Sequence, residues 1–435
     1  MVKFIKTHDL YSVIKPLLYV SKAVGVAPFV LEGELKNRRL RISGPAVVYS
    51  VLVLLILLGR QISLIREIYL FDLETVFKTA AVIETVTYSI STSGFALMFL
   101  LKRTDMYKIL HKLSLFDELF GDMERSYNSA LLFLIGQMCL HLVVVLTLSI
   151  TVSSYVGLIT FIDFVGRSAT VNNLPIILIV DTQLFNIMLL LKQRFFAVNL
   201  KITDHLNENH NTFSIRPRNS KVAISLITQI PKVTLMDSSF DLPCERFQYL
   251  KNLHEFLCDI SELVNCTYAI HMLLNVILKF IAIVFNIYFR LLRLLKSDKG
   301  QYSDDVWEWV MTGMLGWYVL KLGGIVWACA STAREANRTA VLVHKLLSKT
   351  RDPGVKEELQ LFSLQLLHRK VQFTACGFFP LDFTLLYSII GAVTTYLVIL
   401  IQFQLSFANP KQNGTVSAVL PVSTSSDLFT PTLPP

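Results

Sequence analysis

Long runs of apolar residues recur along the chain and predict its secondary structure. A helix that crosses a bilayer needs about 20 mostly apolar residues. Seven runs meet this requirement, at about residues 45–65, 79–101, 130–152, 171–191, 268–289, 307–331 and 384–407. We therefore expect an all-α membrane protein with seven transmembrane helices.

Composition supports this prediction. Hydrophobic residues make up 53% of the 435 residues and charged residues 17%, against about 25% charged in an average soluble domain. The net charge of +9 would suit nucleic acid or anionic lipid. The basic residues cluster beside the apolar runs, however, which favours lipid and excludes nucleic acid as the expected partner. The six cysteines have neither CxxC spacing nor histidine partners, so we expect no metal site, cofactor or disulfide framework.

The distribution of basic residues predicts the orientation. Counted on alternating sides of the spans, Lys and Arg number 30 on the side of the N-terminus and 9 on the other, with Lys279 and Lys321 inside spans. Because positive residues accumulate in cytoplasmic loops, we expect the N-terminus inside and the C-terminus outside. Asn413, in the extracellular tail 408–435, would then be a glycosylation site.

The segments outside the spans suggest further divisions. Residues 1–44 are expected to be cytoplasmic, with the interrupted apolar stretch 17–31 at the membrane interface. The region 45–331 holds the first six spans and a long intracellular loop near 192–267. The flanks of that loop have apolar residues at helical spacing, which predicts helices that continue beyond the bilayer.

The last span, 384–407, has a stripe of mostly small or polar residues. They recur every three or four positions on one helix face, at Thr384, Ser388, Gly391, Thr395, Val398, Gln402 and Ser406. Several copies of this helix around an axis would line a pore. The alternative is that small residues simply allow tight packing between helices.

The same span resembles a known family. Thr395-Tyr396, five mostly apolar residues and Gln402-Phe403 are similar to the signature of the seventh span in insect gustatory receptors. The stretch Ala375-Cys376-Gly377-Phe378-Phe379 before the span also resembles that family, as does Ala333-Arg334-Glu335 after the sixth span.

The resemblance implies a tetrameric, ligand-gated, cation-permeable channel in the plasma membrane of a sensory neuron dendrite. A small tastant would open it, and no G protein would take part. The subunit would assemble with itself, alone or together with related receptors. Leu397 stands where sugar receptors often have an acidic residue. The sequence therefore resembles fructose-type receptors and the branch credited with nutrients, nucleosides and bitter compounds.

The resemblance also implies roles for particular residues. Gln402 and Phe403 would form the gate near the outer end of the pore, which Val398 and Ser406 would also line. Thr395 and Tyr396 would couple this gate to the ligand pocket.

Residues 332–383 lie between the last two spans and predict amphipathic helices over 335–349 and 355–370, joined at Asp352-Pro353-Gly354. Neither helix can bury its apolar face alone. The resemblance implies that they form a cytoplasmic anchor where four subunits pack together; the alternative is a pair of membrane-surface helices.

Ionisable residues inside spans need a partner or water and are candidates for function. The candidates for a ligand pocket are Glu84, Tyr88, Asp181, Gln183, Asn186, Trp317 and Lys321. Structural explanations compete with this role. Lys321 could pair with Asp181 or Glu84, Lys279 could reach the interface, and His141 could be an ordinary core residue.

Other classes of function are weaker. A secondary transporter of a small solute is the main alternative, because Asp181, Lys279 and Lys321 would suit substrate or proton coupling. No inverted repeat supports it. A membrane enzyme is not expected, because no HExxH, GxSxG or paired His-Asp motif occurs.

Overall fold

The computed structural model describes residues 9–32, 39–70, 75–121, 124–156, 169–206, 243–296 and 304–408, and this part of the chain is mainly helical. The helices are α1 (Leu10–Ala23), α2 (Gly44–Leu70), α3 (Thr75–Leu101), α4 (Arg103–Phe120), α5 (Glu124–Val156), α7 (Ala169–Leu206), α9 (Pro243–Lys296), α10 (Asp304–Lys349), α11 (Pro353–His368) and α12 (Phe383–Ala408). The strands form two antiparallel pairs, β1 (Phe29–Glu32) with β2 (Arg39–Ile42) and β3 (Thr374–Ala375) with β4 (Phe379–Pro380).

The predicted spans coincide with apolar helices. Among the described residues, α2, α5, α7, α9, α10 and α12 each contain a segment long and apolar enough to cross a membrane. Thr85–Leu101 of α3 is a shorter apolar helix. The structure therefore agrees with an all-α protein built around seven apolar helices.

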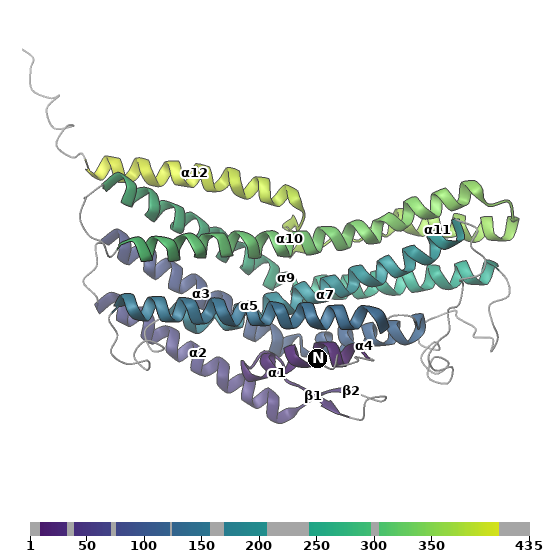
Figure 1. Cartoon of the computed structure of the whole chain (residues 1–435), viewed down its shortest axis with the longest axis horizontal. Coiled ribbons are helices and arrows are strands. Elements are labelled where there is room, and N and C mark those ends of the chain that lie inside the picture. Colours follow the sequence, from purple (N-terminus) through teal and green to yellow (C-terminus); the bar gives the residue numbers. More distant parts are fainter. Residues whose placement is uncertain are drawn as a thin grey trace, which may run out of the picture.

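Three helices extend well past the length of a bilayer span. α7, α9 and α10 contain 38, 54 and 46 residues, and Figure 1 shows their extensions beside α11 at one end of the molecule. The expected continuation of the helices near the 192–267 loop is thus present. Residues 335–349 are helical as predicted, as the continuation of α10. α10 runs on without a break because no Gly or Pro interrupts it between Ile325 and Lys349.

The amphipathic faces in this extension are buried inside a single chain. The predicted apolar positions Leu342, Leu346, Leu359, Phe362 and Leu366 are at most 7% exposed. These positions are thus buried against other helices of the same chain. α11 packs on both α9 and α10, which cover these positions, whereas Leu361, Leu364 and Leu367 of α11 remain exposed.

The segment expected at the membrane interface is packed against the bundle. α1 is capped by Asp9, whose carboxylate accepts a hydrogen bond from Ser12 N at 3.1 Å. Its apolar face, including Leu17, is buried, and α1 contacts α4, α5 and α7. Gly25 has a φ of +78°, which lets the chain reverse after α1. Val26 and Ala27 are consequently buried as the chain leads into β1.

A hairpin connects the helical extension to α12. Cys376 and Gly377 have φ values of 50° and 79°, which permits the tight turn between β3 and β4. Thr374 N donates to Asn265 Oδ1 of α9 at 2.8 Å, and Val371 N donates to Asn337 Oδ1 of α10 at 3.1 Å. Both asparagine side chains are therefore used in positioning the start of α12.

α4 was not predicted, and a buried ion pair fixes it to α7. Arg194 Nη2 lies 2.6 Å from Asp117 Oδ2, with side chains that are 0% and 8% exposed. Tyr127 of α5 donates to the same carboxylate oxygen at 2.6 Å. The ion pair and the Tyr127 hydrogen bond thus join three helices. The alternation of spans and loops in the sequence does not reveal this contact.

We expect Arg194→Met to destabilise the protein strongly, by about 3–5 kcal/mol, because Asp117 would become an uncompensated buried charge. The double variant Asp117→Leu, Arg194→Met should recover most of the loss. Thermal unfolding of the detergent-purified protein measures both effects. Arg338→Met, which removes an exposed pair with Glu335, is the control and should change stability by less than about 1 kcal/mol. Equal effects of the two single variants would contradict the prediction.

Candidate functional site

A buried polar group joins α7 and α9 in the apolar part of the bundle. Asp181 Oδ2 lies 3.0 Å from Lys279 Nζ, and Asp181 Oδ1 lies 3.3 Å from His271 Nε2. Asn275 donates a hydrogen bond to Asp181 and accepts one from Lys279. All four residues are at most 3% exposed. We call these four residues the Asp181 cluster.

The Asp181 cluster has a simple origin in the sequence. His271, Asn275 and Lys279 follow one another at intervals of four residues, so they lie on one face of α9. Asp181 meets that face from α7. Ionised groups in a low-dielectric interior are stable only when they are paired and hydrogen-bonded, and this arrangement supplies both requirements.

A second polar group lies between α5, α7 and α10. Lys321 Nζ is 2.7 Å from His141 Nε2, and His141 Nδ1 is 3.2 Å from Thr182 Oγ1. Lys321 has only hydrogen-bond donors. Its contact therefore assigns the acceptor role to Nε2 and the hydrogen to Nδ1, which donates to Thr182. Lys321 Nζ also lies 5.4 Å from the ring centroid of Trp317. We call these four residues the Lys321 cluster.

The structure bears on three structural alternatives from the sequence, apart from a pairing of Lys321 with Glu84, whose side chain is outside the described set. Lys279 does not extend to the interface, because it is buried against Asp181. Lys321 does not pair with Asp181 but contacts His141. His141 is buried as expected, yet it is hydrogen-bonded rather than merely packed. These partners come from different helices, so sequence spacing could not select them.

Two buried polar atoms beside the Asp181 cluster lack a hydrogen-bond partner in the described structure: Tyr268 Oη and His271 Nδ1. Their rings lie on one side of α9, with centroids 6.1 Å apart. The ring centroid of Phe95 in α3 lies 4.4 Å from that of His271. The ring centroid of Phe99, also in α3, lies 6.2 Å from that of Tyr268. Because buried polar groups normally find partners, this is where a hydroxyl or amine of a bound molecule could be recognised.

The predicted pocket residues with described side chains have several different partners. Asp181 belongs to the Asp181 cluster, and Trp317 and Lys321 to the Lys321 cluster. Tyr88 is buried and its hydroxyl lies 2.6 Å from that of Tyr318. Gln183 and Asn186 belong to neither cluster: Gln183 donates to Ser21 Oγ of α1 at 2.7 Å, and Asn186 donates to Gln137 Oε1 of α5 at 2.9 Å.

Some predicted sites fall outside what the structure describes. Glu84 lies in α3 and Ser406 in α12, but their side chains are outside the described set. Asn413 lies outside the described residues altogether. His271 and Asn275 were missed as candidates, although their spacing from Lys279 within an apolar span is a signal that the sequence contains.

The polar stripe of α12 faces away from its own subunit. Six of its seven positions have described side chains, and all six are exposed: Thr384, Ser388, Gly391, Thr395, Val398 and Gln402. Phe403 is 60% exposed. In Figure 1, α12 runs along one edge of the bundle. Only 17% of the apolar segment of α12 is buried, against 72% for that of α7. The stripe therefore does not serve packing within the chain.

One aromatic contact links α12 to the helix that carries the Asp181 cluster. Tyr396 meets Phe280 of α9 edge to face, with ring centroids 5.8 Å apart. Phe280 directly follows Lys279 in the sequence. A movement of α9 at the Asp181 cluster would therefore reach α12 through adjacent residues.

The bundle has the fold of an insect chemoreceptor. The olfactory receptor OR5 from Machilis hrabei matches with a TM-score of 0.65 over 91% of this chain and 98% of that one, at 14% sequence identity. The structure of OR5 in complex with eugenol matches with a TM-score of 0.59. These proteins share the arrangement of helices with this chain.

Sequence comparison identifies the family. The model of the 7tm chemosensory receptor family matches residues 14–407, and the chain belongs to that family. Putative gustatory receptor 28a of Drosophila melanogaster is 26% identical over 92% of this chain and 93% of its own length. Putative gustatory receptor 28b is 32% identical, but the match spans 52% of this chain and 47% of that relative. The resemblance found in the last span is thus confirmed along most of the chain.

We expect Lys279→Met to lower the thermal stability of the purified protein by an amount equivalent to about 3–5 kcal/mol, because it leaves the Asp181 carboxylate buried without its cation. Adding Asp181→Asn removes the orphaned charge and should restore most of the stability. Unfolding temperatures of the two variants provide the measurement. A double variant no more stable than Lys279→Met would show that the two residues are not energetically coupled.

Proposed function

We propose that this chain is a gustatory receptor that acts as a ligand-gated, non-selective cation channel. A small polar tastant, such as a fructose-type sugar, nutrient, nucleoside or bitter compound, opens it. Its subunits form a tetramer, with α12 of each around a central pore. The N-terminus lies in the cytoplasm of a sensory neuron and the C-terminus outside. The observation that carries this proposal is the exposed polar stripe of α12.

The stripe supports a pore because its polar side chains are exposed on the surface of a single subunit. Gln402 is exposed on an apolar helix, and lipid offers no hydrogen-bond partners to its amide. Thr395 is also exposed, although its hydroxyl donates to Gly391 O at 3.0 Å. Copies of α12 around an axis would place these groups against water and ions. Gln402 amides could then contact a hydrated cation, and the exposed Phe403 rings could close the pore by excluding water.

The buried clusters support a ligand site in the bundle. The unpartnered Tyr268 hydroxyl and His271 Nδ1 suit a molecule with hydroxyls or amines. A ligand there would alter the contacts of α9. The contact between Phe280 and Tyr396 then gives a route by which binding biases the position of α12.

Relatives are consistent with more than one tastant. Gustatory receptor for sugar taste 43a of Drosophila melanogaster is 29% identical over 49% of this chain. Gustatory receptor for bitter taste 66a is 27% identical over 39% of it. A panel of sugars, nucleosides, nutrients and bitter compounds is therefore the appropriate challenge.

Whole-cell recording from cells that express this chain alone tests the channel. We expect a cation current evoked by one class of tastant, and we expect Gln402→Ala to change its ion permeability ratio or block. Thr394→Ala lies on the same helix beside the stripe and should leave both unchanged. Tastant uptake without current, in cells whose surface expression is confirmed, would indicate a secondary transporter and refute the channel.

Coupling is tested separately at the contact between α9 and α12. Tyr396→Ala should reduce the maximal current or shift the tastant concentration for half-activation about tenfold or more, because the link to α9 is lost. Tyr387→Ala changes another exposed tyrosine of α12 and serves as the matched control. Tastant binding to purified Tyr396→Ala protein should persist. If binding and gating fell together, Tyr396 would belong to the pocket instead.

A further inference from the structure

A row of three stacked aromatic rings crosses α5, α7 and α10. The ring centroids of Phe133 and Phe185 lie 6.0 Å apart with an interplanar angle of 24°, and those of Phe185 and Trp327 lie 6.3 Å apart at 27°. Phe133 is 50% exposed and Trp327 is 43% exposed. Three helices thus contribute one ring each to a continuous aromatic surface on the outside of the bundle.

Two basic residues lie at one end of this row. Lys192 Nζ is 4.7 Å from the centroid of the Trp327 ring. Arg334 is exposed and follows Trp327 by seven positions, so both lie on one face of α10. Thr332 Oγ1 of α10 donates to Met188 O of α7 at 2.9 Å, which holds the two helices side by side here. Lys192 and Arg334 therefore lie at a similar level of the bundle.

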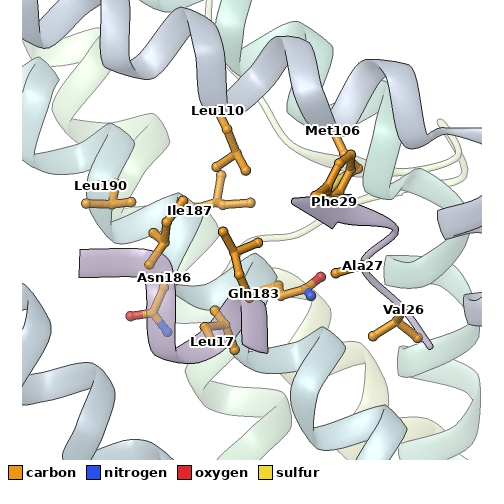
Figure 2. Close-up of a pocket in the computed structure, with 12 residues that line it drawn as sticks. Leu17, Val26, Ala27, Phe29, Met106, Leu110, Gln183, Asn186, Ile187 and Leu190 are labelled. Carbon is orange, nitrogen blue, oxygen red and sulfur yellow. The ribbon is translucent and has the colours of Figure 1, made fainter. Parts of the chain in front are cut away.

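Phe185 and Lys192 lie on the side of α7 that faces away from α1. Gln183 and Leu190, each two positions earlier, line a small cavity that α1 and β1 close (Figure 2). Residues two positions apart on a helix point in nearly opposite directions. The side of α7 with Phe185 and Lys192 is thus left to contact α5, α10 and the surroundings of the protein. We call Phe133, Phe185, Lys192, Trp327 and Arg334 the Trp327 surface.

The rings and the cations match the two parts of a phospholipid. All three rings belong to predicted spans, whereas Lys192 directly follows the span 171–191 and Arg334 lies three residues after the span 307–331. The cations therefore lie at the level of the lipid headgroups. Neither basic side chain has a hydrogen bond or salt bridge within the described part of the chain. Unpaired cations between helices at the membrane boundary favour an anionic headgroup.

We propose that the Trp327 surface binds an anionic phospholipid, whose phosphate contacts Lys192 and Arg334 and whose acyl chains lie against the three rings. With the orientation proposed above, this site faces the cytoplasmic leaflet, where anionic lipids are concentrated. The lipid contacts α5, α7 and α10, the same three helices that form the Lys321 cluster. Its binding therefore stabilises this arrangement of helices.

Quenching by brominated lipids tests the site, because bromine on an acyl chain quenches the fluorescence of a tryptophan that it contacts. The chain has four tryptophans. Trp307→Phe, Trp309→Phe and Trp317→Phe leave Trp327 as the reporter in the full chain. This variant is reconstituted in phosphatidylcholine with increasing fractions of brominated phosphatidylglycerol or brominated phosphatidylcholine, which carry the same acyl chains. Both leaflets contain the lipid, so the result depends neither on orientation nor on channel activity.

We expect phosphatidylglycerol to bind beside Trp327 about tenfold or more tightly than phosphatidylcholine, because each nearby cation favours an anionic lipid about fivefold. The double variant Lys192→Gln, Arg334→Gln should bind the two lipids about equally, and its unfolding temperature shows that it is folded. Lys108→Gln removes an exposed lysine of α4 and should leave the preference unchanged.

A second reporter locates the effect along the helix. Trp309 is 77% exposed and lies at the opposite end of the apolar run 307–331. A variant that keeps only this tryptophan should show no preference for phosphatidylglycerol. A preference of similar size at Trp309 would indicate general attraction of the basic protein for anionic lipid and contradict a site at Trp327.

Three other results would overturn the proposal. The first is equal quenching of Trp327 by the two lipids, and the second is a preference that survives in Lys192→Gln, Arg334→Gln. The third is the absence of quenching by either lipid, which would show that protein, such as a second copy of the chain, covers the Trp327 surface. Displacement of the lipid by inorganic phosphate at constant ionic strength would assign the cations to a free anion instead of a phospholipid.

Discussion

The burial of charge inside an apolar helical bundle is the constraint on which this structure depends. Asp181 Oδ2 and Lys279 Nζ lie 3.0 Å apart, and both side chains are almost fully buried. Asp117 Oδ2 and Arg194 Nη2 form a second buried pair at 2.6 Å. Neither membrane lipid nor an apolar core can stabilise such charges. Each pair therefore fixes the relative positions of the helices that contribute it, and shifting one helix past another would expose an unpaired ion.

α7 is the helix around which these constraints meet. Its successive polar residues face different neighbours: Asp181 meets α9, Thr182 meets α5, and Gln183 meets α1. Farther along, Asn199 contacts both Glu335 and Thr339 of α10. A helix with polar contacts on several sides has few alternative positions. α12 is the opposite case: the described positions of its polar stripe are exposed, and Ser388 and Thr395 donate only to carbonyls one turn earlier in the same helix.

How far the sequence predicted the site depends on where the interacting residues lie. The α12 stripe could be predicted because all its members belong to one helix, whose geometry fixes which residues share a face. The tertiary structure gave Asp181, Gln183 and Asn186 different hydrogen-bond partners, although Gln183 and Asn186 line one cavity. Asp181 lies two and five positions from them, so it points in a different direction on the helix.

The sequence by itself determined the apolar helices and the family, because hydrophobic length and the motif of the last span are local properties. It also placed ionisable groups inside spans. Only the tertiary structure decided that Asp181 pairs with Lys279, that Lys321 contacts His141, and that α1 closes a cavity over Gln183. These contacts join residues far apart in the chain. They depend on how helices of similar apolar composition pack, and many packings satisfy the same hydrophobic pattern.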